Sequence, residues 1–387
     1  MIILAIETSC DDTAIAILEI SAQGGPASGG KNWKLEILSN IVSSQVKLHA
    51  KYGGVFPSLA KREHQKNLPI VFKRALKEAG FGIFNDQFSI FKKKPKIDLI
   101  AVTNGPGLEP CLWTGINFAK DLAKKMNLPI VPTNHIEAHI LANFIRSNYK
   151  LQITNYKNLL PAVCLVVSGG HTQLILAKGL GKYQILGETR DDAAGECFDK
   201  VARILGLGYP GGPAIAAAAA KLQITNHKSQ IKLPRPMMAQ KNYDFSFSGL
   251  KTAVLYKYQK SNISAQGGPA SGGKTQKSKE YINAMCAEVQ QAIIDVLLKK
   301  ALKAAKDFKA KSVILGGGVT ANEELRKQFK EKIEKELPNV KFFVPETKFS
   351  TDNAAMVGLA AYFNYLKNPK KKYPDIEAKA NLRIDKS

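Results

Sequence analysis

The sequence predicts an α/β protein of two lobes that share a duplicated order of strands and helices. Each half opens with two β-rich apolar runs joined by a tight turn, which reads ETSCDD in the first half and SGGH in the second. In each half a third strand, a helix, a fourth strand and a second helix follow, so the order βββαβα occurs twice. A length of 387 residues with 45% hydrophobic content is enough to bury cores of this size.

The elements of the first half follow from apolar runs and helical periodicity. We expect strands at 2–6, 13–18 and 35–42, a helix ending near Gly80, a strand at 98–103 and a helix at about 115–126. The strand at 98–103 runs into NGPG, whose Gly and Pro residues end it.

The second half repeats this order with longer helices. We expect strands at 161–167, 172–177 and 183–189, helices at 191–205 and about 279–308, a strand at 312–315, a helix from about 321, a short strand at 342–344 and a final helix after Asp352. The glycines GGG follow the strand at 312–315 and mark a tight turn before the next helix.

These elements predict the domain organisation. A first lobe is expected at 1–134, a second lobe at 135–345, and a C-terminal segment at 346–387, whose helix packs back on the first lobe and whose end is a basic tail. The segment ISAQGGPASGGK occurs twice without change, at 20–31 and at 263–274. We interpret each copy as an inserted loop, one in each lobe.

The second copy creates a match to the P-loop pattern G-x-x-x-x-G-K-[ST], GPASGGKT at 268–275. A P-loop needs a buried strand before it and a helix after it, so that backbone N–H groups converge on phosphate. The preceding KYQKSNISAQG is polar and predicts no such strand, and Thr275 lies outside the copied unit. We therefore interpret the match as a surface loop and expect any nucleotide to bind elsewhere.

Charge and cysteine content narrow the class of protein. Lys and Arg outnumber Asp and Glu by 56 to 32, which favours a polyanionic partner such as nucleic acid but is also typical of a solvated basic face. The five cysteines are scattered without C-x-x-C spacing, so reduced thiols are expected. No segment reads as a secretion signal or a membrane span, and the prediction is a cytoplasmic protein with no membrane partner.

The paired turns resemble a known superfamily. Small residues in a hairpin turn leave backbone N–H groups open to phosphate, and two such turns across a cleft can hold a nucleotide. This layout resembles the actin, Hsp70 and sugar-kinase (ASKHA) superfamily, in which each of two lobes presents a phosphate-binding hairpin.

HIEAH at 135–139 indicates a possible metal site. His135 and His139 are four residues apart and share one face of a helix, although such a pair is often only structural. Glu137 lies about 200° around the helix from the first histidine, so it is a poor base for the H-E-x-x-H chemistry of metalloproteases. Asp352 in STDNAAM is expected to cap the following helix or to supply a carboxylate ligand, and the two roles are compatible. Two histidines and one carboxylate suit Fe(II) or Zn(II), and we favour Fe(II).

Glycine-rich turns and isolated polar residues indicate a nucleotide site. VVSGGHT at 166–172 and LGGGVTAN at 315–322 are tight turns that allow close backbone approach to an anion, and Asn322 can bond a base or sugar. Asp199 on DDAAGECFDK can accept from ribose hydroxyls, or it is an ordinary solvated helix carboxylate. Asp11 and Asp12 in the first turn are candidates for proton removal, or they serve ordinary turn chemistry.

Nine ordered motifs together resemble one family closely: IETSCDDTA, SQVKLHAKYGGVFPSLAKREH, GPGL, HIEAH, LVVSGGHTQL, DDAAGECFDKVARILGLGYPGGP, FSFSGLKTAV, GGGVTAN and STDNAAM. This is the TsaD family of tRNA N6-adenosine threonylcarbamoyltransferases, once labelled O-sialoglycoprotein endopeptidases, and the motifs resemble its bacterial branch. The resemblance runs from about residue 1 to about residue 363.

The resemblance implies a reaction, a site and partners. It implies transfer of a threonylcarbamoyl group from threonylcarbamoyl-AMP to N6 of adenosine 37 in tRNAs that read codons beginning with A. It implies partners of two kinds, a paralogous TsaB-like protein of the same fold and a small TsaE-like P-loop ATPase. It implies that the metal is bound by His135, His139 and Asp352, and that the nucleotide lies against Val166, Val167, Ser168, Gly169, Gly170, Asp199, Gly212 and Asn322.

Three other functions remain to be weighed against this one. A metalloprotease is the older family label, and the position of Glu137 argues against it. A small-molecule kinase shares the superfamily fold but needs no histidine pair, and fold alone does not decide function. A module that binds tRNA without chemistry is the third.

Overall fold

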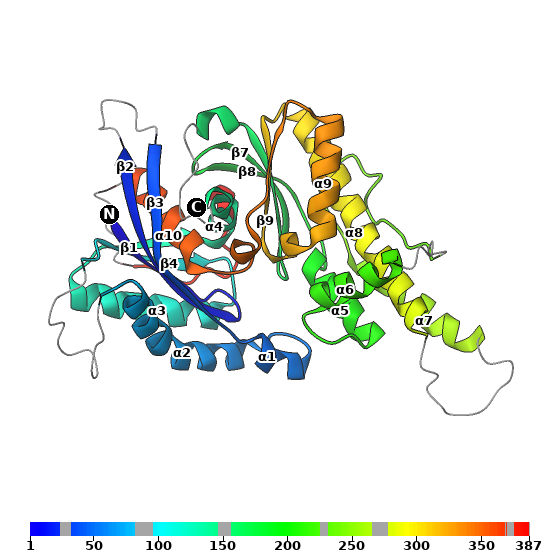
Figure 1. Ribbon diagram of the computed structural model, residues 1–387, viewed down its shortest axis with the longest axis horizontal. Helices are drawn as coiled ribbons and strands as arrows, with labels where there is room; N and C mark the ends of the chain where they lie inside the picture. Colours follow the sequence, from blue (N-terminus) through cyan, green and yellow to red (C-terminus); the bar gives the residue numbers. More distant parts are fainter. Residues whose placement is uncertain are drawn as a thin grey trace.

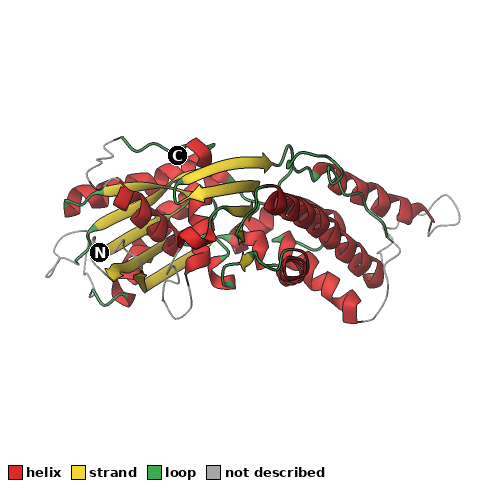
Figure 2. Ribbon diagram, turned by 90° about the horizontal axis from the view of Figure 1, so that it is seen from above, coloured by secondary structure: helices red, strands yellow, loops and turns green. Residues whose placement is uncertain are grey.

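The computed structural model describes residues 1–23, 32–81, 96–145, 156–224, 231–264, 278–367, 369 and 375–386. Two five-stranded sheets form its frame, with helices packed around them (Figures 1 and 2). Most of each predicted inserted loop, residues 24–31 and 265–274, lies outside the described residues.

The first sheet has the order β3-β2-β1-β4-β5. Its strands are β1 (Ile2–Glu7), β2 (Asp12–Gln23), β3 (Asn32–Ser44), β4 (Leu99–Gly105) and β5 (Ile130–Asn134). β1 pairs antiparallel with β2 and parallel with β4. Alternate residues of β1 enter different cores, because Leu4 and Ile6 pack under α2 (Pro57–Glu78) and α3 (Glu109–Met126), whereas Ile3 and Ala5 face α10 (Ala354–Lys367). Burial on both faces explains why this strand is almost entirely apolar.

The second sheet has the order β10-β9-β6-β7-β8. Read from β8 to β10, with strands numbered from the start of each half, this is the order 3-2-1-4-5 of the first sheet. Its strands are β6 (Ala162–Val167), β7 (Thr172–Gly179), β8 (Lys182–Glu188), β9 (Ser312–Gly316) and β10 (Lys341–Phe343). The prediction of a duplicated α/β architecture is confirmed. Each half also holds a fifth strand and a closing helix, so the repeat is longer than βββαβα.

Helices of the second half cover the outer face of its sheet and share one core with it. They are α5 (Ala194–Leu205), α6 (Gly211–Ile224), α7 (Ser248–Ser264), α8 (Lys279–Asp307) and α9 (Glu323–Glu336). The short helices are α1 (Val46–His49) and α4 (His135–Leu141), with 3-10 turns at Ala50–Tyr52, Ala142–Phe144, Tyr156–Leu159, Gly318–Ala321, Thr347–Phe349 and Ile384–Lys386.

One core joins the two halves. Residues of α4 and α10 pack with the inner face of the first sheet and with Ala162, Cys164 and Ile314 of the second. In Figure 1 α4 lies between the two sheets, next to α10. The chain that closes the second half thus packs on the first sheet, which brings residue 352 near residue 135. The domain boundaries at 134 and 345 stay a prediction.

Several elements differ from the sequence-based expectation. β5, α6 and α7 were not predicted, and α3 begins at Glu109 rather than near Gly115, because Pro110 occupies a first-turn position where its missing N–H costs nothing. The helix expected from residue 191 begins at Ala194, because the carboxylate of Asp191 accepts hydrogen bonds from the backbone N–H groups of Phe247 and Ser248.

The last described residues before residue 268 belong to the helix α7, which ends at Ser264, and not to a strand. This finding agrees with the interpretation that GPASGGKT is no P-loop, although residues 268–275 themselves lie outside the described residues. Across the part of the chain that the structure describes, no helix is long and apolar enough to cross a membrane.

Candidate metal and substrate site

The two histidines lie on a short helix that begins directly after a strand. Asn134 ends β5 and caps α4, since its side-chain oxygen accepts from the N–H groups of Ile136 and Glu137 at 2.9 and 3.2 Å. The rings of His135 and His139 are both buried, with centroids 4.6 Å apart. The expectation that the pair shares one face of a helix is confirmed.

Asp352 reaches this pair from the turn before α10. Its Oδ1 lies 3.1 Å from Nε2 of His139 and 3.5 Å from Nε2 of His135. Asn353, not Asp352, caps the helix, because its side-chain oxygen accepts from the N–H of Met356 at 3.2 Å. The alternative in which Asp352 is the helix cap is therefore wrong, and its carboxylate is directed at the histidines.

Glu7 stands behind the histidine pair and was not predicted. This fully buried carboxylate at the end of β1 lies 3.0 Å from Nδ1 of His135 and accepts from the hydroxyl of Thr103 at 2.7 Å. A carboxylate on the far nitrogen of a histidine fixes the ring and directs its other nitrogen toward a metal. A charged residue that ends an otherwise apolar strand was the signal that could have identified it.

The donor set fits one divalent metal. One ligand atom from each of His135, His139 and Asp352 can be chosen so that all lie within 4.8 Å of one another. Two imidazoles and one carboxylate that leave further positions open suit Fe(II) and Zn(II) alike. The second carboxylate, Glu7, supplies the outer support that such sites use.

Burial and neighbouring charges shift the pKa values of these side chains. Burial disfavours the charged form of His135, but the carboxylates of Glu7 and Asp352 outweigh this effect and raise its pKa to about 9. Burial would raise the pKa of Asp352, but the histidines lower it to about 2. Burial lowers the pKa of His139, which keeps that ring neutral and available as a ligand.

A cavity of about 1250 Å³ opens between the two halves next to these residues. Its lining includes the two hairpin turns, the first turns of α5 and α6 and the segment before α9. Of the predicted residues, those that line it are Asp11, Asp12, His135, Ser168, Gly169, Gly170, Asp199, Gly212, Asn322 and Asp352.

Two hydrogen bonds close the hairpin turn of the second half, and its glycines leave free space beside the backbone. The N–H of Ser168 donates to the carbonyl of His171 at 2.8 Å, and the N–H of His171 donates to the Ser168 hydroxyl at 3.1 Å. The space beside Gly169 and Gly170 is empty, since a Cβ at either would meet nothing within 4 Å. Gly317 has φ +87°, and a Cβ there would lie 2.4 Å from the Val167 carbonyl oxygen, so glycine is required for this close approach.

Val166 and Val167 are placed differently from the other predicted residues. Both side chains are fully buried in β6, one in the shared core and one in the core of the second half. Neither lines the cavity. Because alternate residues of a strand point to opposite faces, these two valines position the turn that follows them rather than present side chains to a ligand.

Asp199 and Asn322 line the cavity but already have protein partners. Oδ1 of Asp199 accepts from the N–H of Gly211 at 2.7 Å, which ties α5 to α6. The side-chain oxygen of Asn322 caps α9 by accepting from the N–H of Leu325 at 3.0 Å, and its amide nitrogen donates to Gln290 at 2.7 Å. Each therefore has a structural role beside any contact with a ligand.

The two aspartates of the first turn face the same cavity. Burial raises the pKa of Asp11, and burial together with the charge of Asp352 raises the pKa of Asp12 to about 7. Oδ1 of Asp12 is buried without a hydrogen-bond partner among the described residues. A carboxyl group with a pKa near neutrality can take up a proton during a reaction at pH 7.

Sequence reasoning missed other lining residues, among them Cys10, Tyr209 and Ala380. His171 also lines the cavity, and burial together with the two nearby histidines lowers its pKa to about 4. Ala380 belongs to the predicted basic tail. Its backbone carbonyl accepts a hydrogen bond from the N–H of Gly107 at 3.1 Å. The tail therefore closes one side of the cavity, which composition alone did not indicate.

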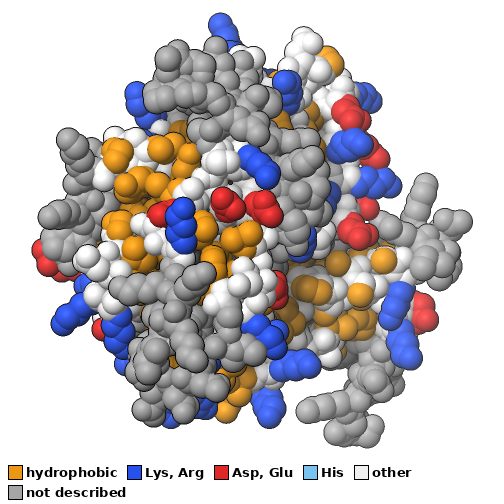
Figure 3. Space-filling model, turned by 60° about the vertical axis from the view of Figure 1, so that its left-hand side comes forward, with side chains coloured by type: hydrophobic (Ala, Val, Ile, Leu, Met, Phe, Trp, Pro, Cys, Tyr) orange, Lys and Arg blue, Asp and Glu red, His pale blue; other side chains and the backbone are white. Residues whose placement is uncertain are grey.

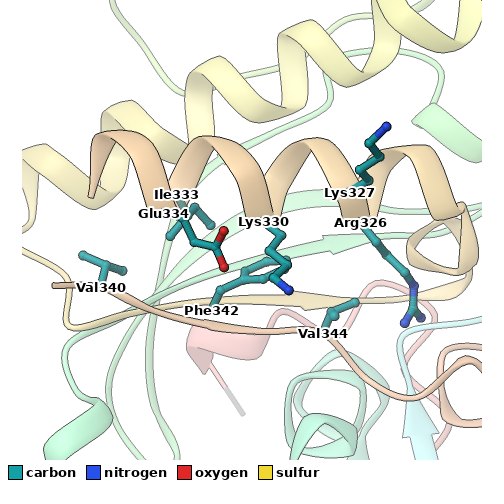
Figure 4. Close-up of a pocket in the computed structure, with 8 residues that line it drawn as sticks. All are labelled: Arg326, Lys327, Lys330, Ile333, Glu334, Val340, Phe342 and Val344. Carbon is teal, nitrogen blue, oxygen red and sulfur yellow. The ribbon is translucent and has the colours of Figure 1, made fainter. Parts of the chain in front are cut away.

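A second, smaller cavity of about 450 Å³ lies between α9 and β10 (Figure 4). Its lining combines apolar and charged side chains: Arg326, Lys327, Lys330, Ile333, Glu334, Val340, Phe342 and Val344. It contains none of the predicted site residues.

Comparison with known proteins identifies the family. A family model described as TsaD, tRNA N6-adenosine threonylcarbamoyltransferase, matches residues 36–359. The chain belongs to this family. The tRNA N6-adenosine threonylcarbamoyltransferase of Thermosipho africanus is 46% identical over 99% of this chain and 100% of the relative. That of Clostridioides difficile is 42% identical over 100% and 99% of the two chains.

The family match confirms the motif resemblance and makes this TsaD-family chain a transferase of tRNA modification. One solved structure has a similar fold. Full-length HypF in its phosphate- and nucleotide-bound form has a TM-score of 0.52 at 11% identity, covering 96% of this chain and 56% of HypF. That likeness concerns the fold alone.

Proposed function

We propose that this TsaD-family chain transfers the threonylcarbamoyl group of threonylcarbamoyl-AMP to N6 of adenosine 37 in tRNAs that read codons beginning with A. The observation that carries the proposal is the position of the His135, His139 and Asp352 cluster beside a cavity bounded by two open hairpin turns. Such a cavity can hold an adenylate with its reactive carbonyl next to the cluster.

The reaction is an acyl transfer. N6 of the adenosine attacks the carbamoyl carbon, a C–N bond forms, the C–O bond to the phosphate breaks, and AMP leaves. N6 loses one proton, and Asp12 with its pKa of about 7 is suited to accept it, with Asp11 beside it in the same turn. A divalent ion held by the cluster would supply Lewis-acid polarisation of the acyl carbonyl.

The remaining residues bind and orient the nucleotide. The open space at Gly169 and Gly170 admits a phosphate to the backbone of the turn, with Ser168 at its start. Asp199, Gly212 and Asn322 line the same cavity, and the adenosine part would lie against them. Val166 and Val167 contribute by holding the turn, as their burial indicates.

Fe(II) is proposed as the metal in the cell, with Zn(II) as the alternative that the same two histidines and one carboxylate admit. A metalloprotease is disfavoured by Glu137, whose carboxylate accepts from Asn364 at 3.1 Å and is therefore directed toward α10. A TsaB-like paralogue and a TsaE-like ATPase are proposed as partners, in the cytoplasm where tRNA is modified.

Reconstitution tests the proposal. Purified protein loaded with Fe(II) is incubated with synthetic threonylcarbamoyl-AMP and unmodified tRNA, and partners are added one at a time. Mass spectrometry of the digested tRNA should show threonylcarbamoyladenosine in amounts that depend on metal. AMP release without modified nucleoside, at every combination of partners, would contradict the transferase reaction, and cleavage of a glycoprotein by the same preparation would favour a protease.

A further inference from the structure

Two aromatic side chains lie exposed next to one another in the loop after α1. Tyr52 and Phe56 are 55% and 52% exposed, and their ring centroids are 5.3 Å apart at an interplanar angle of 55°. Large apolar side chains exposed together leave water-facing surface that a partner would cover. Leu255 and Tyr256 are also exposed neighbours, but of the ring contacts between described residues only the Tyr52–Phe56 contact joins two exposed rings.

The loop that carries the pair borders the substrate cavity. Gly53, Gly54 and Val55, which separate the two aromatic residues, line that cavity. Tyr52 and Phe56 thus flank lining residues in the chain without lining the cavity themselves.

Hydrogen bonds hold this loop in place. The N–H groups of Gly54 and Phe56 donate to the carbonyl and the Nδ1 of the buried His49, both at 3.4 Å. The guanidinium of Arg203 on α5 donates to the carbonyl of Gly53. Gly53 takes φ +68°, which a residue with a side chain rarely adopts. The aromatic pair is thus preorganised, and binding to it would cost little ordering.

The surface around the pair is basic. Residues 46–77 contain eight Lys and Arg residues and one acidic residue, Glu63. Of these cations only Lys66 forms an ion pair with Glu63, at 2.6 Å. Lys47, Lys51 and Lys61 are exposed next to the pair in sequence and form no ion pair with any described residue. Lys and Arg side chains are spread over the face of the molecule that Figure 3 shows, with hydrophobic surface between them.

We propose that Tyr52 and Phe56, with these lysines around them, form a docking surface for single-stranded RNA at the mouth of the cavity. The proposal rests on the proposed function, since the RNA is the loop that contains the target adenosine. That adenosine must leave the base stack to enter a cavity. A neighbouring base then loses its stacking partner, and the aromatic pair replaces it while the lysines contact the adjacent phosphates.

Binding measurements without chemistry test this surface. The probe is an unmodified anticodon stem-loop RNA that carries 2-aminopurine beside the target adenosine, with no threonylcarbamoyl donor present. Base stacking on an aromatic side chain is worth ~1 to 3 kcal/mol, so Tyr52→Ala and Phe56→Ala should each weaken binding at least about fivefold and relieve the 2-aminopurine quenching. Tyr52→Phe should bind as the parent does. Tyr256→Ala on α7, where Tyr256 is 66% exposed, is the matched control and should change nothing.

A double variant tests the cations. Lys47→Gln combined with Lys51→Gln should reduce the slope of log affinity against log salt by about 1.4, as expected when two single-strand phosphate contacts are lost. The aromatic variants should leave that slope unchanged, because stacking releases no counterions. Affinity for the adenylate should stay equal to the parent in all five variants, which shows that they fold.

The outcomes separate this inference from the proposed function. Equal RNA affinity in parent and Tyr52→Ala overturns the docking surface. A Tyr52→Ala variant that binds RNA as the parent does but loses affinity for a TsaB-like protein overturns it as well. A parent protein that binds the stem-loop through Tyr52 yet transfers no group in the reconstituted reaction contradicts the proposed function and leaves the docking surface in place.

Discussion

Replacing Asp12 with asparagine should make the protein more stable and much less active, and the gain in stability should depend on pH. Asp12 lies in the first turn, half-buried, with one carboxylate oxygen that has no hydrogen-bond partner among the described residues. Asparagine has nearly the same shape but no charge. The change therefore removes the charge with little effect on packing.

The magnitude follows from the pKa. Burial, together with the charge of Asp352, raises the pKa of Asp12 from 3.8 to about 7. The folded state therefore keeps a proton that the unfolded state releases between about pH 4 and pH 7, so stability falls as pH rises through this window. A shift of about three units corresponds to ~4 kcal/mol as an upper value, and partial exposure reduces the expected cost to ~2 to 3 kcal/mol.

Urea unfolding of the metal-free protein measures this effect. The variant should exceed the parent by ~2 to 3 kcal/mol at pH 8 and equal it below about pH 3, because the parent carboxyl is protonated there in both states. Asp121→Asn, an exposed position on α3, is the control and should show no such difference. Asp12→Asn should also lower kcat about 10² to 10⁴-fold and abolish the rise of the rate with pH below about 7.

Two results would refute this reasoning. An equal difference in stability at pH 3 and pH 8 would mean that Asp12 does not titrate in this range. A variant with unchanged kcat and the same pH profile would mean that another group accepts the proton from N6.

Three further predictions concern the metal and the nucleotide. His139→Ala should lose bound metal and most transferase activity while the fold survives, as metal analysis and circular dichroism will show; activity that persists in a metal-free preparation contradicts the cluster. Glu7→Gln should weaken metal affinity about 10 to 100-fold in a chelator competition at high pH, since the support for His135 is lost. Asn322→Ala should weaken nucleotide binding by ~1 to 3 kcal/mol in calorimetry, while Lys274→Ala stays within about twofold of the parent; the reverse result would restore the P-loop interpretation.

Local sequence determined most of the elements and part of the site. Apolar runs located β1, β2, β6 and β7 because strands buried on both faces admit few polar residues. The spacing of His135 and His139 fixed their shared helical face, since residues four apart on a helix lie one above the other. The turn SGGH was identified because its small residues leave backbone groups accessible.

Tertiary structure decided what these pieces do together. Identical starts of the copied segment differ in structure. Ile20 lies in β2 and pairs with Leu35 of β3, whereas Ile263 lies in α7, to which no strand is paired among the described residues. Asp352 meets His139 across 213 residues only because α10 packs on the first sheet, and Glu7 supports His135 only because β1 ends beside α4. No periodicity encodes such contacts, since they depend on which faces the two sheets bury against each other.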